Sequence, residues 1–81
     1  MRIDYTQRAL RALKKLPLPV REAFYKQARF LVENRHHPSL RGKKFDETND
    51  VWQARVNRDW RFYFTIEQDR YIVTNIIPHP K

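Results

Sequence analysis

The chain has 81 residues, of which 17 are lysine or arginine and 9 are aspartate or glutamate, so its formal net charge is +8 at neutral pH. This length holds one domain, spanning residues 1–81, and a hydrophobic share of 41% is too high for a disordered tail. The absence of cysteine excludes disulfides and thiolate metal sites. No apolar run approaches the about 18 residues of a membrane helix.

Six of the basic residues lie just before the predicted sheet or on it: Arg41, Lys43, Lys44, Arg55, Arg58 and Arg61. Net charge alone would serve only to keep a small protein soluble, but a local cluster raises the concentration of polyanions at one surface. The distribution therefore favours a nucleic-acid partner over a membrane. No apolar segment follows Met1–Asp4, so no secretory signal is predicted and we expect a cytoplasmic location.

The first part of the chain predicts a short strand followed by a helix. Residues 2–5 place Ile3 and Tyr5 on one face of the strand. Thr6 is a suitable N-cap for the helix, because its hydroxyl can accept from free backbone N–H groups of the first turn. Pro17 ends this helix. Its apolar residues recur at steps of three and four: Ala9, Leu10, Leu13 and Leu16.

A second helix is predicted from Pro19 to about Asn34, after an extended connector at Leu18–Pro19. So short a link predicts that the two helices pack as an antiparallel hairpin. One face of the second helix is marked by Val20, Ala23, Phe24, Gln27, Ala28 and Leu31.

Residues 39–50 form a polar connection that contains the only glycine, Gly42, and residues 43–45 are expected to add a short strand. Strict alternation then predicts two strands that each have one buried face. The apolar positions are Trp52, Ala54 and Val56 in one strand and Trp60, Phe62, Phe64 and Ile66 in the next.

Only one pairing puts both apolar sets on the same side of the sheet. It places Ala54 near Phe62 and Val56 near Trp60, because a slip of one residue would turn one set to water. The loop is then residues 57–59, and Arg55 lies opposite Arg61 on the exposed face. Like charges directly across a sheet are destabilising. Such a pair is best explained by a functional role in binding an anion, and a phosphate group is the natural anion for it.

Residues 71–77 are apolar on both faces, as a central strand would be. Two inward-facing sets remain open for this strand: Tyr71, Val73 and Ile77, or Ile72 and Ile76. The predicted fold class is α+β, with an N-terminal helical hairpin packed on one face of a small antiparallel sheet of three or four strands. The other face of the sheet is wet and basic.

This order of elements resembles the RelE/ParE superfamily of toxins from bacterial type II toxin–antitoxin pairs. The resemblance covers nearly the whole chain and is carried above all by the stretch from Trp52 to Phe64. The family signature is an aromatic and a basic residue, a short polar turn, and then an aromatic–arginine–apolar–x–aromatic run. That run is met by Trp60, Arg61, Phe62 and Phe64.

Two flanking segments add to the resemblance. Residues 40–45 are similar to the basic loop that precedes the signature, and residues 76–79 are similar to the end that carries a catalytic histidine in some members. The chain also departs from the family at two points. Pro80 follows His79 where a tyrosine commonly lies nearby, and Gln53 stands where some members have lysine.

The resemblance implies an endoribonuclease that cuts mRNA, usually on the ribosome, and that an antitoxin holds inactive. Arg61 matches the active-site arginine of the family, Arg55 a basic residue of the preceding strand, and His79 the C-terminal histidine. Attack by the 2′-hydroxyl of RNA needs a base, an acid and charge stabilisation. Arginine suits the last of these because its planar fork stays charged, and histidine suits either proton role.

No metal or other cofactor is expected, because His36, His37 and His79 do not form a credible ligand set. Contacts to RNA phosphates or bases are assigned to Arg41, Lys43, Lys44, Arg58 and Tyr63. The partners implied are an acidic antitoxin, mRNA and the ribosome, with no membrane. Two alternatives stay open: a ParE-like toxin that poisons DNA gyrase without catalysis, and a basic nucleic-acid-binding module that is not toxic.

Overall fold

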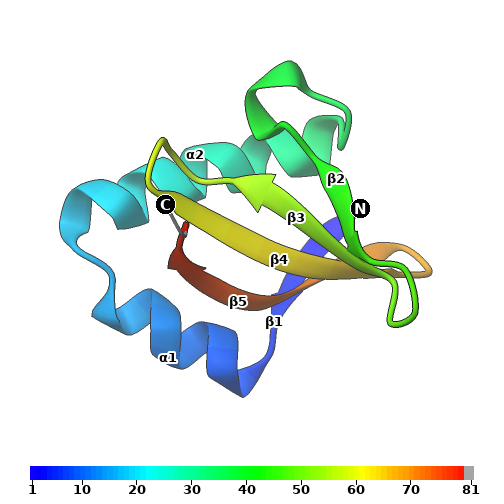
Figure 1. Cartoon of the computed structure of the whole chain (residues 1–81), viewed down its shortest axis with the longest axis horizontal. Coiled ribbons are helices and arrows are strands. Elements are labelled where there is room, and N and C mark those ends of the chain that lie inside the picture. Colours follow the sequence, from blue (N-terminus) through cyan, green and yellow to red (C-terminus); the bar gives the residue numbers. More distant parts are fainter. Residues whose placement is uncertain (80–81) are drawn as a thin grey trace.

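The computed structural model describes residues 1–79, which form two α-helices, one turn of 3-10 helix and five strands (Figure 1). In chain order the elements are β1 (Arg2–Tyr5), α1 (Gln7–Lys15), α2 (Leu18–Glu33), η1 (Pro38–Leu40), β2 (Lys43–Asp46), β3 (Val51–Arg55), β4 (Trp60–Glu67) and β5 (Arg70–Pro78). The predicted helices and strands are confirmed within one or two residues. The connector between the helices is corrected to Leu16 and Pro17, which are extended, whereas Leu18 already lies in α2.

The strands form one sheet in the order β1-β5-β4-β3-β2, in which β1 runs parallel to β5 and the other neighbours are antiparallel. The prediction of three or four antiparallel strands is therefore wrong: the sheet has five strands and is mixed. The prediction failed for β1. Its partner, β5, is more than 60 residues away in the sequence, so no local sequence pattern indicates the pairing. An ion pair of 2.8 Å between Asp4 and Arg70 fastens this pairing.

Both ends of α1 are held by side chains. The Thr6 hydroxyl accepts from the Ala9 backbone N–H at 3.1 Å, as expected of an N-cap, and donates to the Thr74 carbonyl of β5 at 3.2 Å. At the other end the Arg21 guanidinium donates to the carbonyls of Lys14 and Leu16. A cation at a helix C-terminus satisfies carbonyls that have no partner within the helix. Local sequence thus fixes where α1 begins and ends.

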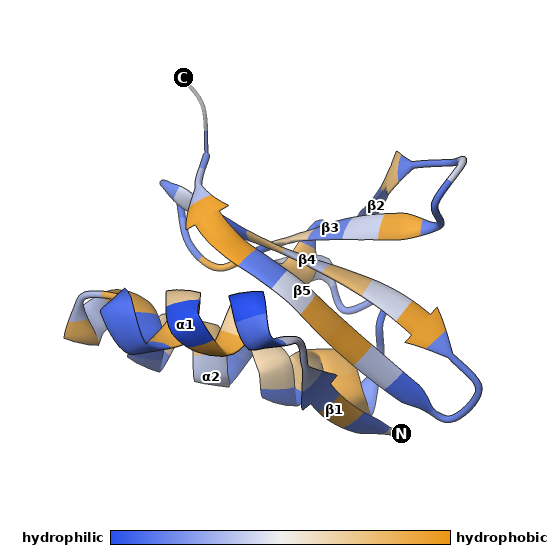
Figure 2. Ribbon diagram, turned by 90° about the horizontal axis from the view of Figure 1, so that it is seen from below, coloured by the Kyte–Doolittle hydropathy of each residue, from blue (hydrophilic) through white to orange (hydrophobic). Residues whose placement is uncertain are grey.

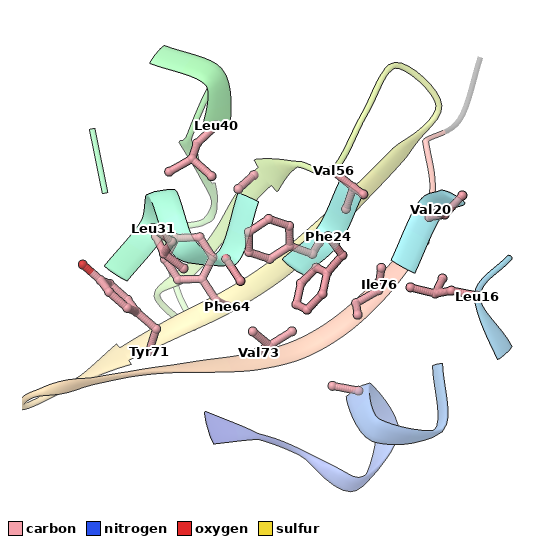
Figure 3. Packing of buried hydrophobic residues seen from close by; sticks show 14 residues of the cluster. Leu16, Val20, Phe24, Leu31, Leu40, Val56, Phe64, Tyr71, Val73 and Ile76 are labelled. Atoms are coloured by element: carbon pink, nitrogen blue, oxygen red, sulfur yellow. The ribbon is translucent and has the colours of Figure 1, made fainter. Parts of the chain in front are cut away.

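Both helices lie on the same side of the sheet (Figure 2). Side chains from the helices, η1 and the strands meet in the space between them (Figure 3). The rings of Phe24 and Phe62 form its centre, with centroids 5.2 Å apart at nearly a right angle. Such edge-to-face pairs add to the free energy gained by burying the rings. Trp52 and Trp60 are only partly buried and lie at the margin of this core.

A β-bulge resolves the ambiguous register of β5. Tyr63 lies opposite Asn75 and Phe64 opposite Val73, so Thr74 is an extra residue in β5. An extra residue reverses the inward and outward alternation. Val73 and Ile76 are consequently both buried, although no single alternating set contains both. Each of the two sequence alternatives is right on one side of the bulge.

Gln27 is the polar residue of the predicted helix face, and it is buried. Its side-chain N–H₂ group donates to the carbonyls of Ser39 at 2.9 Å and Arg55 at 2.8 Å, and its Oε1 accepts from the Ser39 hydroxyl at 2.9 Å. These three bonds join α2 to η1 and to the end of β3. One of them satisfies the backbone carbonyl of Arg55, whose side chain lies on the face of the sheet turned away from Gln27.

We expect Gln27→Met to lower the free energy of unfolding by about 2–3 kcal/mol, because it removes three hydrogen bonds and leaves the Arg55 carbonyl without this donor. Methionine keeps the volume, so little of the loss should come from a cavity. The measurement is urea unfolding followed by circular dichroism, with Gln7→Met, a change at an exposed glutamine, as control. Equal midpoints for the native and Gln27→Met chains would contradict a stabilising role.

Candidate nucleic-acid interface

One face of the sheet is turned away from the helices and is called here the outer face (Figure 2). The predicted arginine pair lies on it, because the residues that alternate with the pair are buried on the helix side. Arg55 lies opposite Arg61, and Ala54 lies opposite Phe62 on the helix side, as predicted. The Val56 backbone N–H donates to the Trp60 carbonyl at 3.0 Å and closes the ladder. The buried aromatic residues of β4 hold this register, because a slip would expose them.

Arg55 and Arg61 lie opposite each other on this face, and the charge of Arg41 adds to the repulsion that Arg61 experiences. The pKa of Arg61 is lowered, first by partial burial and then by repulsion from Arg55 and Arg41, which Tyr63 and Asp59 partly offset. A lowered pKa means that folding makes the charged form of Arg61 less favourable, a destabilisation present at every pH at which the group is charged. Arginine nevertheless remains charged at neutral pH. The electrostatic field here therefore favours a bound anion.

No carboxylate forms an ion pair with Arg41, Arg55 or Arg61 within the part of the chain that the structure describes, and Asp59 offsets the repulsion only in part. The ion pairs among residues 1–79 involve Arg2, Lys44 and Arg70, and none involves Arg41, Arg55 or Arg61. Arg70 shows the contrast, since Asp4 and Glu67 both bind it and its pKa is raised. Arg55 and Arg61 are thus brought together without an acidic ion-pair partner in residues 1–79.

Arg61 also organises the β3–β4 loop. Its Nη1 donates to the carbonyls of Asn57 at 2.7 Å, Trp60 at 2.9 Å and Arg58 at 3.3 Å. The Asn57 side chain closes the same turn by accepting from the backbone N–H groups of Asp59 and Trp60. One nitrogen of the guanidinium is therefore committed to the loop, a role that alternation in the sequence does not reveal.

His79 lies at the same end of the sheet as the arginine pair. Its backbone N–H donates to the Asp59 carbonyl at 2.7 Å, and its side chain is exposed. Ile77 lies opposite Arg61, and His79 is the next alternate position after it. All three predicted catalytic residues, Arg55, Arg61 and His79, therefore lie beside the β3–β4 loop.

The predicted RNA-binding residues divide into two groups. Arg41, Lys43 and Arg58 are exposed, and Lys43 lies opposite Gln53 of the outer face. Arg41 adopts a left-handed backbone conformation with φ of 46° beside Gly42. Conformations of this kind are unfavourable for residues with a Cβ and are retained where the surrounding structure requires them.

Lys44 and Tyr63 are less accessible. Lys44 lies opposite Trp52, away from the outer face, with its Nζ 4.7 Å from the indole centroid and 3.0 Å from an Asp50 carboxylate oxygen. Tyr63 is only 9% exposed, and its hydroxyl donates to Gln53 Oε1 at 3.2 Å. The ring of Phe45, a residue that the sequence pattern did not single out, packs against Tyr63.

Two other features, a metal site and a membrane-spanning helix, are not seen between residues 1 and 79. No three histidine, cysteine, aspartate or glutamate side chains converge there as metal ligands would. His37 instead stacks on Phe30 with ring centroids 4.0 Å apart, and His36 Nε2 accepts from Arg35. No helix in this part of the chain has the length and apolar character needed to cross a membrane.

We expect Arg55→Gln to raise the free energy of unfolding by about 0.2–1 kcal/mol at low ionic strength, because it removes the like charge opposite Arg61. The gain should shrink in high salt, which screens the repulsion. Urea unfolding at two salt concentrations measures it. Arg58→Gln is the matched control, since Arg58 lies in the loop with no arginine opposite. Equal stability of the native and Arg55→Gln chains in low salt would show that the pair is not under repulsion.

The comparisons with known proteins show a shared fold. No protein-family model matches the chain, and no curated protein matches it in sequence. A YoeB/ParE toxin from Agrobacterium tumefaciens is similar in structure, with a TM-score of 0.82 over 99% of this chain and 100% of that one at 13% identity.

The isolated RelE toxin of E. coli gives a TM-score of 0.78 at 19% identity, over 98% of this chain and 84% of that one. A chain of the RelBE2 toxin–antitoxin complex of Mycobacterium tuberculosis gives 0.75 at 20% identity, over 95% of each chain. The chain therefore has the fold of the RelE and YoeB toxins, the superfamily that its sequence resembles.

Proposed function

We propose that this protein is the toxin of a toxin–antitoxin pair and that it cleaves mRNA without a metal ion. The main support is one observation: Arg55 and Arg61 lie opposite each other on the open face of the sheet, with the charge of Arg41 adding to their field, and no carboxylate forms an ion pair with them in residues 1–79. The fold shared with RelE and YoeB toxins points in the same direction.

The proposed reaction is attack by a ribose 2′-oxygen on the adjacent phosphorus. A base takes the proton of the 2′-hydroxyl, the new P–O bond forms, and the bond to the 5′-oxygen breaks as an acid protonates the leaving group. The products are a 2′,3′-cyclic phosphate and a free 5′-hydroxyl. Negative charge builds on the phosphoryl oxygens in the transition state, where fixed cations have the greatest effect.

Arg61 is assigned to the phosphoryl oxygens, with Arg55 beside it. The loop holds one nitrogen of Arg61 by three carbonyls, so the rest of the guanidinium has a fixed position on the outer face. A group held in advance need not reorganise as the reaction proceeds. His79, exposed at the same end of the sheet, is assigned one of the two proton transfers.

Arg41, Lys43 and Arg58 are assigned to phosphates that flank the cleaved bond. They are exposed around the arginine pair, and contacts of this type position a strand without reading its sequence. Lys44 is paired with Asp50, and Tyr63 is buried. For either side chain to contact RNA, binding must first move it from this position. A net charge of +8 also suits binding to the ribosome in the cytoplasm, where mRNA is translated.

We expect expression of the chain in a bacterium to arrest growth and to create new mRNA 5′ ends that carry a hydroxyl. Arg61→Ala should slow cleavage about 10²–10³-fold, as loss of a transition-state donor does elsewhere. Arg55→Ala and His79→Ala should also relieve the arrest. The measurement is mapping of 5′ ends with and without each substitution.

Arg61→Ala also removes the loop hydrogen bonds, so its thermal unfolding must be compared with that of the native chain. Arg55→Ala is free of this problem, because the Arg55 side chain makes no hydrogen bond within residues 1–79. Arg29→Ala, an exposed arginine of α2, removes the same charge elsewhere and should leave toxicity intact. DNA damage without RNA cleavage would instead select the gyrase-poison alternative.

The proposed partner is an acidic antitoxin, and a second basic surface offers it a place. A groove of about 360 Å³ runs between α1 and the end of β5, with Arg8, Arg11 and Lys15 among its lining residues. Its apolar lining is formed by Ala12, Leu16, Trp60, Ile76, Ile77 and Pro78. A basic rim over an apolar floor suits an acidic segment that also carries apolar side chains.

We expect an acidic protein encoded beside this chain's gene to restore growth when it is co-expressed with the native chain. The double charge reversal Arg8→Glu/Arg11→Glu should still arrest growth but escape this rescue, because it repels an acidic partner. Lys26→Glu/Arg29→Glu on α2 is the matched control and should still be rescued. Full rescue of the Arg8→Glu/Arg11→Glu chain would exclude the groove as the docking site.

A further inference from the structure

Phe45 is a large aromatic side chain that the fold leaves in solvent, with 59% of its surface exposed. It lies in β2, the edge strand of the sheet, where the register shifts between Lys44 and Asp46. Phe45 is therefore the extra residue of a β-bulge. Bulges redirect a side chain away from the regular alternation and are enriched beside active sites.

The ring is supported from one side. Its centroid lies 4.8 Å from that of Tyr63 at an interplanar angle of 67°, and the Tyr63 hydroxyl is fixed by Gln53 at 3.2 Å. Gln53 and Tyr63 lie opposite each other in the sheet. The edge-to-face contact buries Tyr63 and leaves the other surface of the Phe45 ring open.

Phe45 lies on the same face of the sheet as the arginine pair. Tyr63, which supports it, is two residues from Arg61 along β4, and Gln53 is two residues from Arg55 along β3. Two residues of a strand span roughly 7 Å. Lys43, which lies opposite Gln53, adds an exposed cation on the same side.

We propose that Phe45 is a stacking platform for one base of a single-stranded RNA whose phosphate lies on Arg55 and Arg61. This inference rests on the proposed function and adds a residue that holds the substrate. Aromatic rings in basic grooves bind single strands because every base offers a flat face for stacking. The surroundings favour RNA over a protein partner, because Lys43, Arg55 and Arg61 on this face form no ion pair with an acid within residues 1–79.

The test uses a short RNA in which every 2′-hydroxyl is methylated, so that it binds but cannot be cleaved. We expect Phe45→Ala to weaken binding about 5- to 150-fold, the range found for loss of one stacked base. Phe45→Leu keeps an apolar side chain without a ring and should lose as much. Phe45→Tyr keeps the ring and should bind like the native chain. Circular dichroism checks that all three variants are folded.

A series of the same RNA with a single abasic position, moved along the strand, identifies the stacked base. At one position the native chain should lose as much affinity as Phe45→Ala does, and the two losses should not add, because both remove one contact. Additive losses at every position, or native affinity in Phe45→Leu, would overturn the stacking role. In that case the proposal that cleavage depends on Arg55 and Arg61 would still stand. Failure of the RNA to bind the native chain at all would instead contradict both proposals.

Discussion

The opposition of Arg55 and Arg61 across β3 and β4 is the constraint on which the candidate site depends. The free energy gained by burying apolar side chains fixes this register, despite the repulsion between the two arginines. Like charges opposite each other oppose the pairing by at most about 1 kcal/mol, whereas an aromatic side chain that buries 150–250 Å² gains several times that amount. A slip of one residue would turn the buried rings of Phe62 and Phe64 to water. The core therefore holds two guanidinium groups together although they repel.

The loop and the core support the pair from two directions. Arg61 binds three carbonyls of its own loop, while Gln27 reaches through from α2 to the carbonyl of Arg55. The backbone of one arginine and the side chain of the other are thus fixed by different parts of the molecule. Sites that stabilise a transition state need such fixed positions. Arg61 holds the loop in addition to the catalytic role proposed for it, so its removal tests both unless the fold is measured separately.

Sequence pattern predicts local features of this chain well and distant ones poorly. Alternation is enough to pair Ala54 with Phe62, because hydrophobic register and a short loop leave one solution. The parallel pairing of β1 with β5 joins segments with no local relation, and bulges at Phe45 and Thr74 reverse the alternation without any marker in the sequence. Tyr63 lies on the outer face, as the alternation in β4 predicts, but Phe45 covers it, and nothing in the sequence marks this contact. The left-handed residues were equally hidden, since Arg41 and not Gly42 adopts that conformation.

The two basic surfaces meet at one end of the sheet, and this has a consequence for inhibition. Ile77 lies opposite Arg61 and Pro78 lies opposite Trp60, yet Ile77, Pro78 and Trp60 also line the groove beside α1. A segment bound in the groove would therefore lie next to the arginine pair without having to cover it. Its carboxylates would be close enough to lower the positive potential felt by an approaching phosphate, because interactions persist over about 8–10 Å at physiological ionic strength. On this view an acidic partner would weaken RNA binding through its charge even where it does not cover the arginine pair, and this effect should fade in high salt.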